Sequence, residues 1–244
     1  MSSELSRQYH SIAIGEGDTW KNTWDDWHLI PSSRPLCNPP PVKTSYVEIP
    51  GGDGILDLTT AMTGKPMYSN RTGSWEFYVE NGFKGWTVLY SEIMMYLHGK
   101  KLMAILDDDQ AYYYEGRFSV NQWRSDPAQS LIVIDYNVYP YKKYIAIDDK
   151  WLWDTFNFET GVIRYYKNLI VDGYLAIDVI GDAMDTIPTI MVSSRNMRME
   201  VGGNLYYLNL GANRFENVVI HEGVNEFYFA GNGVVSFQIV GGTL

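Results

Sequence analysis

Clustered acidic residues are the side chains of this sequence whose types and spacing could do chemistry. Adjacent carboxylates occur at Asp25-Asp26, Asp107-Asp108-Asp109 and Asp148-Asp149. Two close carboxylates can share general acid and base work or bind a divalent cation. Neighbouring residues of a strand point to opposite faces, however, and the Asp107 run falls where a turn is expected. A solvated turn is therefore the favoured interpretation, and a cation site is the alternative.

The histidines and the cysteine form no familiar catalytic or metal-binding pattern. The histidines lack the spacing of a zinc motif, and the sequence has no Gly-x-Ser-x-Gly nucleophile turn; they are His10, His28, His98 and His221. Cys37 lies among prolines without a suggestive histidine beside it. We therefore expect no catalytic residue, no metal, no cofactor and no enzyme activity.

Saccharide binding is an alternative that the residue types leave open. Sugar sites of β-sandwich domains combine an exposed aromatic ring with a few polar groups. Trp151, Trp153, His221 and Asn225 could supply such parts. Each also lies in a strand pattern, where packing in the core or at the rim is the commoner role. A carbohydrate-binding, lectin-like adhesion module is the alternative function.

A glycine-rich stretch at residues 47–59, VEIPGGDGILDLT, raises the question of phosphate binding. A nucleotide loop needs glycines at fixed offsets followed by Lys-Ser/Thr or by the start of a helix. Here Gly51, Gly52 and Gly54 lead into a short apolar run with no such pair. The stretch has another role.

Period-two alternation predicts half-buried antiparallel strands over much of the chain. In residues 75–80, for example, Trp75, Phe77 and Val79 share one face. Apolar spacing predicts one helix at 86–98, with Gly99 as a left-handed cap. Further strands are expected at 102–106, 111–120 and 131–139, and these hairpins are candidate exposed edges for pairing with another chain.

In the second half of the chain, short strand patterns recur about every ten residues between turn signals, which predicts a β-sandwich or jelly roll. The prolines of 31–41 exclude regular structure there, and residues 140–150 are the expected boundary between domains 1–144 and 145–244. The expected fold is mainly β: a β-barrel- or sandwich-like domain with one helix, then an antiparallel β-sandwich. The later strands are expected at 151–158, 162–171, 174–180, 187–193, 196–201, 204–210, 215–220, 224–230 and 234–240.

Composition and charge narrow the classes of partner. The net charge is −10 and both halves are acidic, which disfavours a protein that grips nucleic acid through phosphates. The hydrophobic content of 45% fits a folded domain. No run is long enough for a membrane helix and the start lacks a signal-peptide pattern, so folding in a reducing cytoplasm is expected.

Residues 23–79 contain an ordered set of motifs: the Trp24/Trp27 start, Pro39-Pro40-Pro41, the loop Ile49–Gly54, Leu56-Asp57-Leu58 and Tyr68-x-Asn70-Arg71. In this order the set resembles the distal tail proteins (Dit) of siphophages that infect Gram-positive bacteria. The likeness continues through Leu97-His98-Gly99-Lys100, Tyr112–Arg117 and Pro140-Tyr141-Lys142. It ends with Gly223-x-Asn225 and Gly231-x-Gly233, which are expected to mark two last turns.

This resemblance implies a structural virion protein rather than an enzyme. It implies a homo-hexameric ring at the distal end of the tail, assembled in the host cytoplasm, with a galectin-like second domain projecting outward. Its partners would be the tail tube protein, the tail-associated hub protein and receptor-binding proteins, and DNA would pass through the channel without specific binding. A tail-tube subunit that polymerises into long tubes is a rival within this class.

The candidate subunit-interface residues follow from the glycine loop and the motif after it. Glycines with positive φ let two backbones approach closely. We hypothesise that Pro50–Gly54 and the proline segment 34–41 lie at contacts between subunits or rings, with a plain hairpin turn as the alternative. The interface set is Pro50, Gly51, Gly52, Asp53, Gly54, Tyr68, Asn70 and Arg71.

Overall fold

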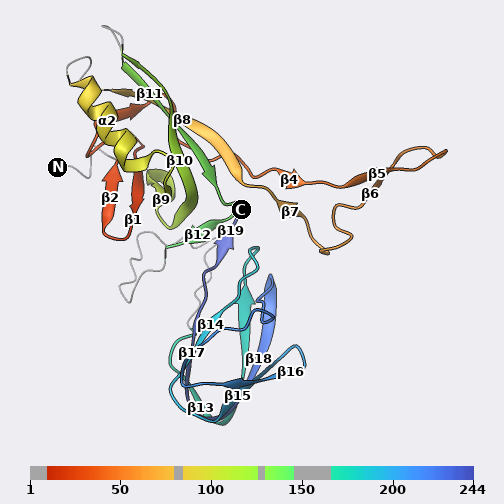
Figure 1. Ribbon diagram of the computed structural model, residues 1–244. Coiled ribbons are helices and arrows are strands. Elements are labelled where there is room, and N and C mark those ends of the chain that lie inside the picture. The colour runs from red at the N-terminus through yellow and green to blue at the C-terminus, as the bar shows by residue number, and fades with distance from the viewer. Residues whose placement is uncertain (1–9, 80–84, 126–129, 146–165) are drawn as a thin grey trace. The chain divides into compact units, whose positions relative to one another are not determined.

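Alternating apolar residues build the antiparallel sheet of the first half of the chain. The computed structural model describes residues 10–79, 85–125, 130–145 and 166–244 (Figure 1). Its chain divides into two compact units, residues 1–142 with Leu244, and residues 143–243. Each unit has its own hydrophobic core.

The main sheet of the first unit has the strand order β2-β1-β9-β10-β11-β8-β3, and every neighbouring pair is antiparallel. Trp75, Phe77 and Val79 are buried on β8, as the alternation predicts. The strands are β1 (Ile12–Glu16), β2 (Thr19–Asn22), β3 (Leu29–Pro31), β8 (Arg71–Val79), β9 (Lys101–Leu106), β10 (Tyr112–Ser125) and β11 (Ser130–Val138).

The predicted helix is α2 (Trp86–Leu97), and it buries Trp86, Ile93 and Leu97 in the core of the first unit. Gly99 follows it with φ +74°, the left-handed conformation expected at a helix end. No helix in the described part of the chain is long and apolar enough to cross a membrane.

The expectation that the strands around 102–120 and 131–139 offer free edges is wrong. β9, β10 and β11 lie inside the sheet with a partner on each side, whereas β2 and β3 end the strand order. Hydrophobic alternation identifies a strand, but strand order depends on non-local pairing that the pattern does not encode. β3 ends at Pro31, a residue that lacks an amide donor and discourages further pairing.

Two long strands organise the second unit: β13 (Leu169–Gly181) and β18 (Gly223–Gln238), which pair along their whole length. On its other edge β18 pairs with β15 through residues near Phe229 and with β14 through residues near Phe237. One strand therefore serves both halves of an antiparallel β-sandwich. The remaining strands are β14 (Thr189–Val192), β15 (Met197–Val201), β16 (Asn204–Leu208) and β17 (Gly211–Asn213).

Several strand predictions for the second unit need correction. The expected strands 224–230 and 234–240 are parts of the single strand β18, and Gly231-x-Gly233 is not a turn. Likewise β13 continues through Gly173, joining two expected strands. No strand forms at 215–220 apart from an isolated bridge between Thr186 and Ile220, and β17 lies earlier in the chain. The expected strand 151–158 and most of 162–171 lie outside the described residues.

Two glycines give this long ribbon positive backbone φ angles in its middle while the pairing of β13 with β18 continues. Gly173 and Gly231 face each other across β13 and β18, with φ +74° and +127°. The amide of Gly173 donates to Asn232 Oδ1 at 2.9 Å. The backbone can therefore adopt a conformation that residues with a Cβ rarely take.

Substitution at Gly173 tests whether this position needs glycine for its positive φ angle. A Cβ at this position meets no atom within 4 Å, so only backbone strain opposes it. We expect Gly173→Ala to lower the free energy of unfolding of the second unit by about 1–2 kcal/mol. Gly173→Asn is the matched control, because asparagine tolerates positive φ, and it should cost less than Ala. Urea unfolding curves measure both, and equal losses would contradict the strain argument.

The overall fold class expected from the sequence is confirmed: mainly β, with a helix-bearing sheet domain followed by an antiparallel β-sandwich. The short strands β12 (Lys142–Tyr144) and β19 (Gly242–Thr243) lie at the division between the units. Four further short strands form an arm of the first unit: β4 (Val42–Lys43), β5 (Tyr46–Glu48), β6 (Ile55–Asp57) and β7 (Met67–Tyr68).

Candidate assembly surface

Residues 42–68 form a two-stranded arm that extends away from the main sheet of the first unit (Figure 1). Near the sheet β4 pairs with β7, and farther out β5 pairs with β6. At the tip, the amide of Gly52 donates to the Ile49 carbonyl at 3.1 Å, and Gly51 and Gly54 adopt φ of +74° and +85°. The glycines of the loop thus close a tight hairpin end.

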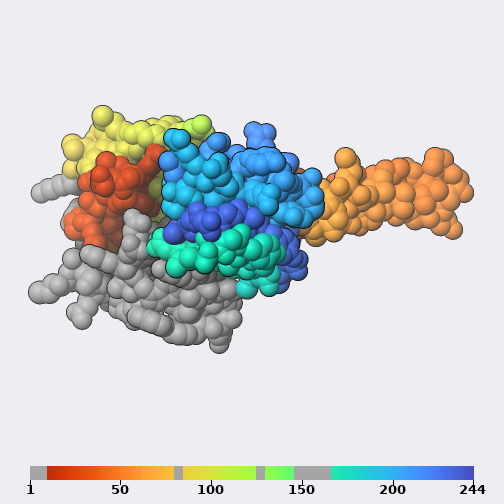
Figure 2. Space-filling model, turned by 90° about the horizontal axis from the view of Figure 1, so that it is seen from below, coloured from red at the N-terminus to blue at the C-terminus, as the bar shows by residue number. Residues whose placement is uncertain are grey.

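The arm exposes an unusual number of large apolar side chains. In Figure 2 it is the narrow orange column of atoms, and residues 41–58 are all exposed. Register places Val47 opposite Leu56 on one face, and Glu48 opposite Ile55 on the other. The exposed apolar residues are Val42, Tyr46, Val47, Ile49, Ile55, Leu56, Leu58, Met62 and Met67.

Such an arm has little to stabilise it in isolation. A two-stranded ribbon that packs against nothing is marginally stable in water, and contiguous exposed apolar area usually marks an interaction site. The described bonds along the arm are local, such as Leu58 N to the Ser45 carbonyl and Ser69 N to the Pro41 carbonyl, both 2.8 Å. Packing against another protein would remove this apolar surface from water.

The base of the arm, in contrast, is fixed by a buried arginine. Arg71 is 5% exposed; its Nε donates to the Pro140 carbonyl at 2.7 Å and its Nη1 to the Asn38 carbonyl at 3.1 Å. Its guanidinium carbon lies 5.6 Å from the centre of the Tyr114 ring. Nη2 is buried without a hydrogen-bond partner among the described residues. Arg71 thus ties together three segments at the point where the arm leaves the sheet.

The proline segment that leads into the arm is fixed in the same place. Tyr136 Oη accepts from the Asn38 amide at 2.9 Å, and Trp75 Nε1 donates to the Leu36 carbonyl at 3.0 Å. Cys37 packs against the core, and burial raises the pKa of its thiol to about 12. The thiol therefore stays protonated near neutral pH, which leaves it a poor nucleophile.

The residues expected from the sequence to form the interface fall into two groups. Pro50, Gly51, Gly52, Asp53 and Gly54 lie together at the exposed tip of the arm. Tyr68, Asn70 and Arg71 lie at the base. The ring centroids of Tyr68 and Tyr141 are 6.1 Å apart in an edge-to-face arrangement, and Asn70 Nδ2 donates to Asn137 Oδ1 at 2.8 Å. Between these two groups lie the exposed apolar residues of the two strands, which we call the shaft of the arm: Val42, Tyr46, Val47, Ile55, Leu56 and Met67. These residues were not among those expected at the interface.

The acidic turn Asp107–Asp109 forms ion pairs with cationic side chains. Neither of the two interpretations from the sequence, a solvated turn or a cation site, included these pairs. Arg34 Nε donates to Asp108 Oδ2 at 2.6 Å, and this bond is the main reason why the pKa of Asp108 is lowered. Lys142 Nζ lies 2.6 Å from Asp109 Oδ2. No group of three His, Cys, Asp or Glu side chains that could hold a metal ion occurs within the described ranges. The pair Asp148-Asp149 lies outside those ranges.

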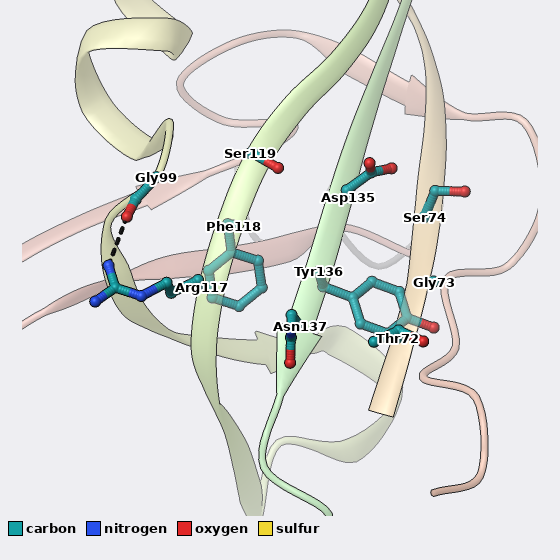
Figure 3. A pocket seen from close by; sticks show the side chains of 10 residues that line it. All are labelled: Thr72, Gly73, Ser74, Gly99, Arg117, Phe118, Ser119, Asp135, Tyr136 and Asn137. Atoms are coloured by element: carbon teal, nitrogen blue, oxygen red, sulfur yellow. Dashed lines mark hydrogen bonds between the residues drawn. The ribbon is translucent and has the colours of Figure 1, made fainter. Parts of the chain in front are cut away.

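A shallow hollow of about 600 Å³ opens on the first unit beside the arm base (Figure 3). Cross-strand register brings Ser119, Asp135 and Ser74 into one row over β10, β11 and β8. Arg117 Nη1 donates to the Gly99 carbonyl at 2.8 Å at its edge. The lining offers hydrogen-bonding groups, but among the described residues no histidine or cysteine lies in it to activate a serine.

Two of the residues considered for saccharide binding are engaged in the second unit. Asn225 Nδ2 donates to the carbonyls of Val179, His221 and Gly223, and its Oδ1 accepts from the His221 amide, so its polar atoms hold a turn. His221 Nδ1 lies 3.1 Å from Asp185 Oδ1. Trp151 and Trp153 lie outside the described residues.

Comparison with known proteins finds similarity at the level of three-dimensional structure. No protein-family model matches the sequence, and no curated protein sequence matches it. Among solved structures, the chain is similar to the crystal structure of the Dit (gp 19.1) protein of SPP1, described as a paradigm of the hub adsorption apparatus in phages that infect Gram-positive bacteria. The TM-score is 0.60 at 12% sequence identity, and the match covers 96% of this chain and 99% of the other. At this identity the likeness establishes a shared fold.

Proposed function

We propose that this chain is a structural protein of a phage tail: the distal tail protein whose copies form a ring between the tail tube and the tail tip. In this role it acts as a hub for the proteins that adsorb to the host. The observation that carries the proposal is the exposed apolar arm, which needs a protein partner. The shared fold with the SPP1 Dit protein supports the same role.

A ring of identical copies explains why one subunit carries a projecting arm. In a closed ring each subunit presents two different, complementary faces to its neighbours. We propose that the shaft and tip of the arm form one face and pack against the first unit of the next copy. The base residues Tyr68, Asn70 and Arg71 then set the direction of the arm, and the tip residues 50–54 approach a neighbouring backbone.

The two units take different parts in this proposal. Residues 1–144 form the ring and its channel, and residues 145–244 form a galectin-like domain at the periphery. The partners are the tail tube protein, the tail-associated hub protein and receptor-binding proteins, and the protein resides at the distal end of the virion tail. DNA passes through the channel without specific binding, and the acidity of the chain favours this because like charges repel.

Sedimentation velocity combined with negative-stain microscopy of the purified full chain tests the proposal. We expect closed rings of six copies, alone or as stacked pairs, and no retention of duplex DNA by these rings at physiological salt. Long tubes would identify a tail-tube subunit instead. A single-chain species at every concentration, or rings that retain DNA tightly, would contradict the proposed role.

A further inference from the structure

A second hollow, in the β-sandwich unit, has a lining that suits a ligand rather than a structural contact. It measures about 540 Å³ and lies where the β15–β16 hairpin turns at Gly202 and Gly203. These turn glycines carry no side chain, which leaves the hollow open beside the strand β18. The side chains with polar atoms that line it are Asn204, Tyr206, Asn217, His221, Asn225, Glu226 and Tyr228.

Three of the lining side chains, Tyr206, Asn217 and Glu226, retain hydrogen-bonding capacity. Asn217 Nδ2 donates to Tyr206 Oη at 2.9 Å, so the amide oxygen of Asn217 and the proton of Tyr206 remain available. Glu226 uses Oε2 to accept from Tyr228 Oη at 2.6 Å, and no contact in the described residues occupies its Oε1. The lining therefore offers both donors and acceptors.

An aromatic surface borders the same carboxylate. The rings of Tyr228 and Tyr174 stack with centroids 6.2 Å apart and an interplanar angle of 21°. Tyr228 is half-buried and lines the hollow, whereas Tyr174 is 61% exposed and lies outside the lining. An aromatic face beside hydrogen-bonding groups suits a ligand that has both apolar C–H faces and hydroxyl groups.

Charge at the hollow discriminates between classes of ligand. Glu226 contributes a carboxylate, and the only cationic candidate in the described lining, His221, already faces the carboxylate of Asp185. No lysine or arginine lines the hollow in the part of the chain that the structure describes. A phosphate or another anion would meet net repulsion there. A neutral ligand rich in hydroxyl groups would not.

We propose that this hollow binds a neutral saccharide, with a sugar ring against Tyr228 and hydroxyl groups bonded to Glu226 and Asn217. The hollow overlaps the set of residues that the sequence indicated, because His221 and Asn225 line it, but Asn225 is committed to its own turn and the proposed contacts come from other side chains. It gives the peripheral unit a direct contact with a surface glycan. The inference does not depend on ring formation, because every group it uses belongs to one chain.

Saturation-transfer NMR on the full-length protein tests this site with four probes: D-glucose, D-galactose, N-acetyl-D-glucosamine and L-rhamnose. We expect at least one of them to receive saturation with a dissociation constant of about 1–10 mM, as suits a shallow, open site. Glucose-6-phosphate should give a signal at least about fivefold weaker than glucose, because the carboxylate repels it.

Substitutions in the lining test whether the saturation transfer comes from binding in this hollow. Glu226→Ala and Tyr228→Ala should each reduce the transfer at least about fivefold. Tyr207→Ala is the matched control: Tyr207 is 76% exposed on the same unit but does not line the hollow, so its loss should change nothing. Thermal melts verify that the variants fold. No transfer to any of the four sugars at about 20 mM, or equal transfer in all three variants, would overturn the proposal. Saturation transfer is read in any oligomeric state, so a failure here leaves the test of the ring unaffected.

Discussion

Replacing Val47 and Leu56 together with aspartate is expected to convert assembled rings into folded single chains. The two side chains face each other on one face of the arm and are 46% and 49% exposed. In the ring they would lose this remaining exposure, so two buried carboxylates replace two apolar contacts of about 1 kcal/mol each, and the cost of burying the charges adds to that loss. Each subunit contact should weaken by more than about 100-fold, which sedimentation velocity measures directly.

The same double substitution should scarcely affect folding of the chain. Both positions are exposed in the single subunit, so the lost cross-strand pair and the repulsion between the two facing carboxylates together cost about 1–2 kcal/mol, confined to the arm. Ile170→Asp is the control: Ile170 is 74% exposed in the second unit, and the substitution places one carboxylate at an exposed apolar position outside the arm. It should leave the ring intact. Two results would show that the arm does not form the contact between subunits: rings that persist in the double variant Val47→Asp with Leu56→Asp, or rings that dissociate in Ile170→Asp.

Arg71→Ala is expected to destabilise the first unit by about 3 kcal/mol, because it removes the two charge-assisted hydrogen bonds of a guanidinium group that is buried at the arm base. The accepting carbonyls belong to Asn38 and Pro140 on either side of the arm base. Amide hydrogen exchange of residues 36–42 and 68–72 should accelerate by more than that of α2, because the anchor acts locally.

Arg117→Ala provides the comparison for Arg71. Arg117 is exposed and donates one bond to the Gly99 carbonyl, so its loss should cost less than about 0.5 kcal/mol. Chemical denaturation gives both free energies. Similar losses for Arg71→Ala and Arg117→Ala would mean that the arm base is held by backbone pairing rather than by the buried guanidinium.

Periodicity predicted the elements whose pattern is local. The alternation at Trp75, Phe77 and Val79 gives the buried face of β8, and the apolar stripe of 86–98 gives α2 with Gly99 after it. In these segments burial of one face follows directly from side-chain direction. The sequence therefore sufficed for strand and helix existence and for the fold class.

Glycine signals were ambiguous, since glycine serves both turns and bends. Gly51 and Gly54 lie at a true hairpin end, whereas Gly231 and Gly233 lie within a continuous strand. The difference depends on whether a partner strand continues alongside, and β13 does so at Gly231. A single sequence contains no local signal for that pairing.

The candidate surface was foreseeable only in part. The glycines of the tip are visible as a motif, but the apolar residues of the shaft have the composition of buried strands. Their exposure follows from β4 and β5 pairing only with β7 and β6, away from the main sheet. The anchoring role of Arg71 depends on carbonyls 33 and 69 residues away in the sequence. Spacing along the chain does not reveal such contacts.

Site-specific photocross-linking from the arm tests the central claim most directly. With p-benzoylphenylalanine in place of Leu56, the assembled protein should on illumination form covalent ladders of linked chains, with cross-links mapped by mass spectrometry to residues 10–142 of a neighbouring copy. The apolar ring of the probe keeps the chemistry of the contact. Cross-links confined to the arm's own chain, in particles that are nevertheless assembled, would contradict the claim that the arm joins one copy to the next.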